Sequence, residues 1–274
     1  MVDAITGPYF DAFTKLWGFI GELCGKALPY NKEIDLEGRI NTILASQKEK
    51  FKPSEKNIKL FCDTIRDYNP IHRNSEIARD FGKKYKLDFS GNVVPGTQIY
   101  ANLDRFVEGV VSIINEKLSD IGYSVVFSGA ELDFPQPVYP GDSIRWQVVE
   151  YKKDGNDINL YISGSNKNRE IIFPGIPITL SRIYRDPEPI EDPRLFSEEF
   201  AFNIGEKTLD DFCTAIDEDE KPSNIPWSLT TSFVTSALLE LSKDGDRLPT
   251  GINKGMKFEF YKRPEFGDLK VRVF

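Results

Sequence analysis

The stretch VPGTQIYANLDRFV, from Val94 to Val107, decides the fold of this 274-residue chain, because it occurs twice. Its diverged second copy, IPWSLTTSFVTSAL, begins at Ile225. After Pro95 and Gly96, apolar residues recur every three or four positions well beyond the quoted stretch. That spacing is typical of a long amphipathic helix, and proline is favoured at a helix start. We therefore predict a long helix that begins at Pro95–Gly96.

Two segments on either side of this helix are repeated as well. SEKNIKLFCDTI from Ser54 matches GEKTLDDFCTAI from Gly205, and GAELDFPQPVYPGDSIRWQV from Gly129 matches GMKFEFYKRPEFGDLKVRV from Gly255. The first pair of segments is offset by 151 positions and the helix pair by 131, so the second copy is 20 residues shorter between them. Self-similarity of this kind predicts two copies of one scaffold, and the second copy lacks a loop.

The sequence around the helix predicts strands and one further helix. Residues 123–134, 143–151, 158–163 and 171–184 show strand patterns, and Asp154-Gly155-Asn156-Asp157 has the composition of a hairpin turn. Ser54 is expected to cap a helix that runs to residue 65. Residues 8–26 carry an apolar stripe at helical spacing. This stripe predicts a helix that packs on the body of the protein or, alternatively, binds a partner or a membrane surface.

These patterns divide the chain into four parts. We predict an N-terminal helical extension over residues 1–50, a first copy over 51–184, a stiff linker over 185–197 and a second copy over 198–274. The linker contains three prolines among acidic residues, a composition that favours an extended spacer. Only seven residues follow Gly267, which matches Gly141 of the first copy. We therefore expect either a short second sheet or a sequence that is cut short.

Composition excludes several classes of function. The net charge of −8 argues against bulk binding to nucleic acid or to an anionic membrane. No apolar run is long enough to span a membrane. The three cysteines, at positions 24, 62 and 213, show no metal-binding spacing, so we expect no metal site and a reduced, cytoplasmic protein.

The loop that the second copy lacks contains the only histidine of the chain. It reads DYNPIH, from Asp67 to His72. A carboxylate and an imidazole on one loop can act as a general base and a general acid near neutral pH. Pro70 fixes its own backbone and keeps Asn69 extended, which stiffens the loop. The alternative is that His72 is an ordinary surface or core residue and that Asn-Pro is a simple turn.

The order of these features resembles the MaoC-like family of hot dog fold hydratases and dehydratases. The family signature Asp-x-Asn-Pro-x-His is complete here, and VVPGT at residues 93–97 and PVYPGD at 137–142 follow it in the family's order. The resemblance covers roughly residues 50–184, and a weaker echo runs from about residue 200. It implies an α+β double hot dog fold, in which two antiparallel sheets are each wrapped around a long central helix.

The resemblance also implies a reaction and its residues. A (R)-specific hydro-lyase of this family adds water reversibly to a trans-2-enoyl thioester and forms the (R)-3-hydroxyacyl thioester. Asp67 and His72 would hold the water, Asn69 would tie down the loop, and the backbone N–H of Gly96 would bind the thioester oxygen. No cofactor is expected beyond the coenzyme A or phosphopantetheine of the substrate. A non-catalytic acyl-thioester-binding or assembly protein and a thioesterase remain as alternatives.

Three further positions bear on partners and on the second copy. Arg73, Lys83 and Lys84 are expected to contact the phosphates of coenzyme A or of an acyl carrier protein; the alternative is a solvated helix face. The resemblance also allows a homodimer. Trp227 stands in the second copy where Gly96 stands in the first, so we expect one active site per chain. Arg66 departs from the family, which usually has glycine or another small residue before the aspartate.

Overall fold

The computed structural model describes residues 36–168, 170–184, 198–217, 222, 225–241, 255–259 and 266–273. The chain divides into two compact units, Met1–Thr42 and Ile43–Phe274. Helix α2 (Leu36–Ala45) contains the boundary between them. The helix predicted at residues 8–26 and the linker predicted at 185–197 lie outside the described residues.

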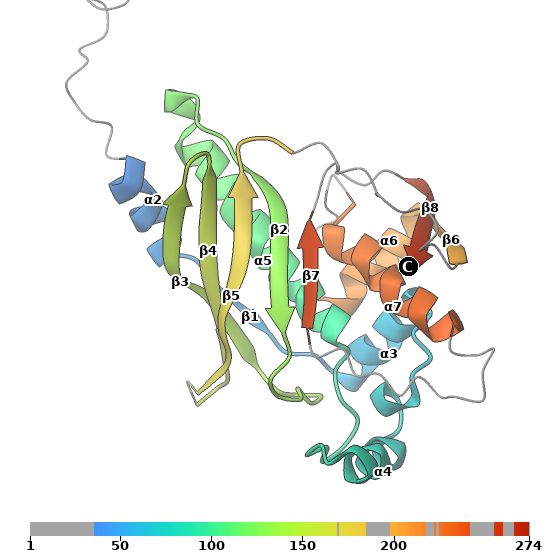
Figure 1. The fold of residues 1–274 in the computed structure, drawn as a ribbon. Coiled ribbons are helices and arrows are strands. Elements are labelled where there is room, and N and C mark those ends of the chain that lie inside the picture. The colour runs from blue at the N-terminus through green and yellow to red at the C-terminus, as the bar shows by residue number, and fades with distance from the viewer. Residues whose placement is uncertain are drawn as a thin grey trace, which may run out of the picture. The chain divides into compact units, whose positions relative to one another are not determined.

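The described elements of the second unit follow the order of the two sequence copies (Figure 1). The first copy contains β1 (Lys48–Phe51), α3 (Glu55–Thr64), η1 (Pro70–His72), α4 (Ser75–Tyr85), α5 (Gly96–Lys117), η2 (Ser119–Ile121), β2 (Val126–Asp133), β3 (Ile144–Asp154), β4 (Asp157–Ser165) and β5 (Ile171–Ser181). The second contains β6 (Glu198–Ile204), α6 (Glu206–Ala215), α7 (Trp227–Leu241), β7 (Gly255–Glu259) and β8 (Gly267–Val273).

The long helix α5 begins at Gly96 and confirms the prediction from its apolar spacing. It lies against one face of a curved antiparallel sheet (Figure 1). Trp146 of β3 is fully buried, and its indole Nε1 donates a 2.7 Å hydrogen bond to Asn102 Oδ1 of α5. Because a buried polar atom needs a partner, this bond fixes how the sheet and the helix meet.

The predicted strands and their hairpin are also confirmed, with shifted ends. In the β3–β4 hairpin Asp154 pairs with Asp157, and Gly155 adopts a left-handed φ of +58° that suits glycine in a two-residue turn. Strand β3 therefore extends three residues beyond the predicted residue 151. Helix α3 is confirmed too, since the side chain of Ser54 accepts a hydrogen bond from the Asn57 N–H at its start.

One strand of the second copy belongs to the sheet of the first. The six-stranded sheet has the order β1-β3-β4-β5-β2-β7, so β7 extends it beyond β2. In this pairing Glu131 lies opposite Lys257, and these two residues occupy the same position in the two copies. The other described sheet contains only β6 and β8. The prediction of one sheet wrapped around each central helix is therefore not confirmed, because β2 and β7 join the two copies edge to edge.

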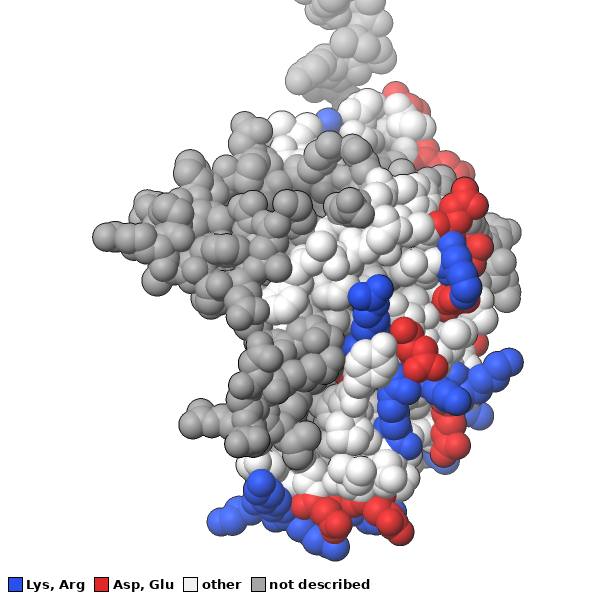
Figure 2. Space-filling model, turned by 90° about the vertical axis from the view of Figure 1, so that its right-hand side faces the viewer, with Lys and Arg blue, Asp and Glu red and all other residues white. Residues whose placement is uncertain are grey.

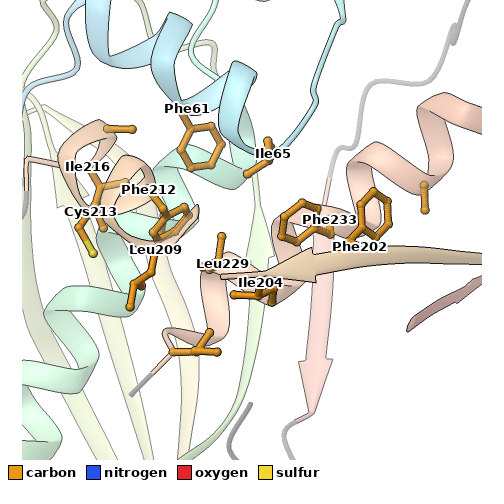
Figure 3. Packing of buried hydrophobic residues seen from close by; sticks show 14 residues of the cluster. Phe61, Ile65, Phe202, Ile204, Leu209, Phe212, Cys213, Ile216, Leu229 and Phe233 are labelled. Carbon is orange, nitrogen blue, oxygen red and sulfur yellow. The ribbon is translucent and has the colours of Figure 1, made fainter. Parts of the chain in front are cut away.

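The remaining contacts between the copies follow an approximate twofold relation. The rings of the equivalent residues Phe61 and Phe212 lie 5.6 Å apart, with their planes inclined at 41°. They belong to a buried apolar cluster, here called the inter-copy core, formed by α3, α5, β6, α6 and α7 (Figure 3). The β6–β8 ladder also matches β1–β3, because Phe202 pairs with Leu269 as Phe51 pairs with Ile144.

Side chains of the central helices cap the shorter helices of the opposite copy in the same paired way. Arg105 of α5 donates to the carbonyl of Ile216, at the end of α6. Ser236 of α7 donates from its hydroxyl to the carbonyl of Ile65, at the end of α3. Each bond satisfies a carbonyl that a helix end leaves without an intrahelical partner. The two copies thus stabilise each other's helix ends.

Candidate active site

The end of α3 places the candidate carboxylate. Asp67 N–H donates to the carbonyl of Cys62 over 2.8 Å, and Arg66 N–H donates to that of Asp63 over 3.4 Å. This pattern is a Schellman motif, which requires a left-handed residue after the helix cap. Arg66 takes that conformation with φ +59°. Its position explains why glycine suits this site, and the Arg66 side chain is exposed with its guanidinium 5.9 Å from the ring of Phe202.

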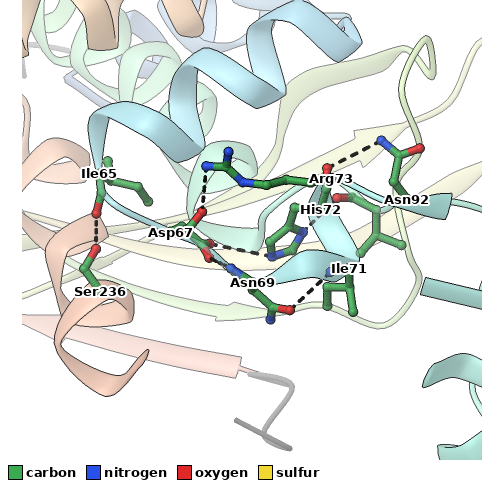
Figure 4. Close-up of polar contacts among 9 residues, drawn as sticks. Ile65, Asp67, Asn69, Ile71, His72, Arg73, Asn92 and Ser236 are labelled. Atoms are coloured by element: carbon green, nitrogen blue, oxygen red, sulfur yellow. Dashed lines mark hydrogen bonds and ion pairs between the residues drawn. The ribbon is translucent and has the colours of Figure 1, made fainter. Parts of the chain in front are cut away.

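The Asp67 carboxylate is buried and points toward the imidazole of His72 (Figure 4). Only 1% of the residue is exposed. Its Oδ1 accepts a 2.9 Å hydrogen bond from the Asn69 N–H. Its Oδ2 has no hydrogen-bond partner among the described residues and lies 3.6 Å from His72 Nε2. A buried carboxylate oxygen without a partner is costly, so a water molecule that donates a hydrogen bond to it from beside the pair would be stabilised.

The backbone holds the ring of His72 in place. Its Nδ1 lies 2.8 Å from the carbonyl oxygen of Val93. A carbonyl accepts only, so the Nδ1 atom carries the proton and Nε2 has a free lone pair in the neutral ring. The segment of Val93 is held in turn, since its N–H donates to the Ile71 carbonyl over 3.1 Å. In its neutral form the imidazole therefore presents an acceptor to the side of Asp67.

Asn69 and Pro70 shape the turn between the two groups. Asn69 is extended, with φ −61° and ψ 118°, as expected for a residue before proline. Its Oδ1 accepts a 3.3 Å hydrogen bond from the Ile71 N–H, so its side chain caps the short helix η1. Asn69 thereby stabilises the loop through its N–H, which donates to Asp67, and its side chain, which accepts from Ile71.

Arg73 is bound within the same loop. Its Nη2 lies 2.8 Å from Asp63 Oδ1 and donates a 3.1 Å bond to the Asp67 carbonyl. Its guanidinium also lies 5.6 Å from the ring centre of Tyr68. These contacts join the end of α3 to the start of the loop, so the Arg73 side chain helps to position Asp67 through its backbone carbonyl.

The start of α5 supplies unbonded backbone donors close in sequence to Val93. Pro95 provides no side-chain cap, and the N–H groups of Gly96 and Thr97 form no hydrogen bond with the described residues. A Cβ on Gly96 would come within 3.0 Å of the Phe134 ring. A side chain at this position would therefore require the Phe134 ring to move by a few tenths of an ångström. The buried Thr97 hydroxyl also has no partner among the described residues.

The lysines predicted to contact phosphate lie in the last turn of α4. Lys83 and Lys84 are exposed; Lys83 is 3.2 Å from Asp80, and the Lys84 ammonium lies 5.1 Å from the Tyr85 ring. Figure 2 shows basic and acidic side chains intermixed at the lower end of the view, where Figure 1 places α4. The described charges here do not form a patch of one sign.

Sequence reasoning missed several residues that build this site. The Val93 carbonyl has no sequence signal, because any residue supplies a carbonyl. Thr97 was visible within the VVPGT segment as a hydroxyl in the first turn of the helix. Ser236 could have been found from its alignment with Arg105 in the repeat, and Figure 4 shows it beside Ile65, two residues before Asp67.

Among the described residues, Cys62 offers no thiolate nucleophile, and there is no metal site or membrane-spanning helix. Burial, reinforced by the charge of Asp67, raises the pKa of the Cys62 thiol, so Cys62 is not a thiolate nucleophile near neutral pH. The described part of the chain holds no group of three side chains suited to a metal ion. None of its helices combines the length and the apolar character that a membrane crossing requires.

The structure resembles solved hot dog proteins at low sequence identity. A MaoC-like dehydratase superimposes with a TM-score of 0.53 and 11% identity over 86% of this chain and 88% of its own. A putative MaoC domain protein dehydratase from Chloroflexus aurantiacus gives 0.52 and 11% over 80% and 75%. A conserved hypothetical protein from Mycobacterium tuberculosis, described as a double hotdog fold, gives 0.52 and 10% over 85% and 84%.

These likenesses establish the fold. This chain has the hot dog fold of the MaoC-like dehydratases, with an antiparallel sheet around a long helix and a second, diverged copy beside it. No protein-family model matches the sequence. No curated protein matches it either.

Proposed function

We propose that this chain catalyses the reversible hydration of trans-2-enoyl thioesters to (R)-3-hydroxyacyl thioesters. The observation that carries the proposal is the buried Asp67 Oδ2, which has no hydrogen bond among the described residues and lies 3.6 Å from Nε2 of His72. When the imidazole is neutral, both atoms are acceptors, and one water molecule beside them can donate a hydrogen to each. The unbroken Asp-x-Asn-Pro-x-His signature and the MaoC-like fold support the same reaction.

The pair can perform both proton transfers of the hydration. As the water oxygen bonds to C3 of the enoyl group, one of its protons passes to the Asp67–His72 pair. The electrons of the C2–C3 double bond move toward the thioester carbonyl and give an enolate. A proton from the pair then bonds to C2, and the charge of the pair returns to its starting value. General acid–base catalysis of this kind contributes about 10²- to 10⁴-fold in rate.

The start of α5 can stabilise the enolate oxygen. The N–H groups of Gly96 and Thr97 lie at the positive end of a 22-residue helix. Donors fixed before the reaction stabilise developing negative charge without reorganisation. We assign Gly96 N–H as the principal donor, and Thr97, through its N–H or its buried hydroxyl, as the second.

The substrate side of the proposal rests on fewer observations. Lys83 and Lys84 are exposed cations that coenzyme A or carrier-protein phosphates could approach, whereas Arg73 already contacts Asp63 and the loop. The reaction as written needs no metal or redox cofactor. An acyl carrier protein partner, a homodimer and a cytoplasmic location stay predictions from the sequence.

A crotonyl-CoA assay tests the proposal. Loss of the conjugated enoyl absorbance is followed with the full chain, and the product is analysed for (R)-3-hydroxybutyryl-CoA. We expect turnover by the wild type and a loss of about 10²- to 10⁴-fold in kcat for Asp67→Asn and for His72→Ala. Asp211→Asn, which removes a partly exposed carboxylate that pairs with Lys207 on α6, should keep full activity.

Each other outcome identifies a different function. Release of free thiol without formation of the hydroxyacyl product would identify a thioesterase. Binding of crotonyl-CoA without turnover would identify an acyl-thioester-binding protein. Wild-type inactivity across acyl lengths, or unchanged activity in both loop variants, would overturn the hydratase proposal.

A further inference from the structure

A buried carboxylate of the first copy occupies the start of the second copy's central helix. Asp104, on α5, accepts a 2.8 Å hydrogen bond at Oδ2 from the backbone N–H of Ser228. Ser228 is the second residue of α7, and both residues are buried to 99% or more. The N-terminus of a helix favours negative charge because its first N–H groups lack partners. Asp104 thus supplies from within the chain a carboxyl oxygen that accepts from a donor of this helix start.

This helix start is the repeat equivalent of the proposed oxyanion site. The offset of 131 positions relates Gly96 to Trp227 and Thr97 to Ser228. The donor that Asp104 binds in the second copy is therefore the counterpart of the Thr97 N–H, which has no described partner in the first.

The approximate twofold relation predicts which residue faces the first site. It pairs Arg105 with Ser236, because these residues cap Ile216 and Ile65 in the same way. The residue before Ser236 is Thr235, so Thr235 is the counterpart of Asp104. The start of α7 contacts the carboxylate of Asp104, whereas the start of α5 is expected to contact the neutral Thr235.

We propose that Asp104 fills, in the second copy, the position that the thioester oxygen takes in the first, and that Thr235 leaves the first position open. The chain then has one active centre because its second oxyanion position is closed from within, in addition to the loss of the catalytic loop. Trp227 contributes to the closure, since it is buried and its ring lies 6.0 Å from that of Tyr184. The assignment of the α5 start to the thioester oxygen rests on the proposed function. The contact of Asp104 with the start of α7 does not depend on that function.

The first arm of the test measures stability and needs no substrate. Asp104→Leu keeps a similar side-chain size but removes the acceptor, so the Ser228 N–H loses its partner. We expect the Tm of the full chain to fall by about 3–10 °C, and by less for Asp104→Asn, which keeps an acceptor oxygen. Glu116→Gln makes the same carboxylate-to-amide change at an exposed position of α5 and should shift Tm by under about 2 °C. A shift for Asp104→Leu no larger than that of Glu116→Gln would overturn the proposal.

The second arm moves the carboxylate to the first copy. Thr235→Asp should place an anion at the start of α5 and lower kcat/KM for crotonyl-CoA by at least about 10²-fold, the scale of losing an oxyanion donor. Thr235→Asn has nearly the same size without the charge and should stay within about threefold of the wild type. Equal activity of a folded Thr235→Asp and Thr235→Asn would contradict the proposal. Wild-type inactivity would overturn the proposed function alone, and the stability arm would then decide the role of Asp104.

Discussion

The two copies follow the same path to the end of their first helix and then diverge. Arg66 and Asp217 are equivalent residues, and both adopt a left-handed backbone, with φ +59° and +57°. After Arg66 the first copy continues into the loop of Asp67 and His72, whereas the second copy has 20 fewer residues before its central helix. The shared part is the scaffold, which includes the start of α5, and the proposed acid–base pair lies in the inserted part. Activity and stability are therefore separable by mutation, and the following predictions test that separation.

The largest effect is expected where the copies depend on each other. Phe212→Ala removes a fully buried ring that packs on Phe61 in the inter-copy core. We expect a loss of about 3–5 kcal/mol in the free energy of unfolding, measured by denaturant titration of the full chain. Phe266→Ala removes a ring that is 53% exposed and should cost far less. Equal costs would mean that the second copy adds little to the stability of the first.

A loss of activity is expected from a small change at the start of α5. Gly96→Ala brings a Cβ within 3.0 Å of the Phe134 ring, so the ring or the helix start must shift. A contact this close requires a shift of a few tenths of an ångström. Because misplacing a catalytic group by about 1 Å costs on the order of 10²-fold, we expect this smaller shift to lower kcat/KM by several-fold up to about 10-fold. Alanine is a better helix former than glycine, so the fold should not be weakened.

Gly109→Ala is the matched control for this change. Gly109 lies in the same helix, and a Cβ there would meet no atom within 4 Å. We expect a gain of about 0.5–1 kcal/mol in the free energy of unfolding and unchanged activity. A Gly96→Ala variant as active as Gly109→Ala would remove Gly96 from the proposed site.

Local patterns predicted the elements, whereas pairings distant in sequence escaped prediction. Apolar spacing was sufficient for α5, and turn composition for the hairpin at Gly155. The left-handed Arg66 was not predicted, because arginine gives no signal for that conformation. The pairing of β7 with β2 was missed because strand patterns do not encode which edge a strand joins. The hydrogen bond between Asp104 and Ser228 spans 124 positions, so no local pattern contains it.

In the candidate site, too, some residues could be predicted from local sequence and others depend on the fold. Asp67 and His72 were identifiable from residue type and spacing, since few side chains can transfer protons at neutral pH. The groups that orient them were not, because the Val93 carbonyl is backbone and the contacts of Arg73 depend on the packed loop. A sequence can therefore name the reacting groups of such a site, but their orientation requires the fold.

An intermediate effect is expected from the hydroxyl that joins α7 to the catalytic loop. Ser236→Ala removes the hydrogen bond to the Ile65 carbonyl, two residues before Asp67. We expect a loss of about 1–2 kcal/mol in the free energy of unfolding and a several-fold loss of kcat, since the loop is less firmly held. Ser232→Ala is the control, because the Ser232 hydroxyl bonds only the Ser228 carbonyl within the same helix among the described residues. Activity lost equally in both variants would contradict a specific link between α7 and the loop.

The smallest effect concerns a charge that only the first copy carries. Glu49 of β1 lies opposite Trp146, and its counterpart Phe200 of β6 lies opposite Val271. Phe200 packs against the inter-copy core, whereas Glu49 Oε1 lies 3.1 Å from Arg105 Nε. Burial raises the pKa of the Glu49 carboxyl more than Arg105 lowers it. The first copy thus holds a partly buried carboxylate where the second holds an aromatic ring.

The titration of Glu49 gives this difference a pH dependence of known sign. With its pKa raised above the unfolded value of 4.5, the folded state holds the Glu49 proton more tightly than the unfolded state. Wild-type stability should therefore fall as pH rises from about 4.5 through the folded-state pKa, and Glu49→Gln should lack that fall. As pH rises, we expect the free energy of unfolding of Glu49→Gln to increase relative to the wild type by at most about 1 kcal/mol, the scale of partly exposed ion pairs. Unfolding titrations between pH 4 and 8 measure this difference. The opposite trend would mean that the attraction of Arg105 exceeds the cost of burial at Glu49.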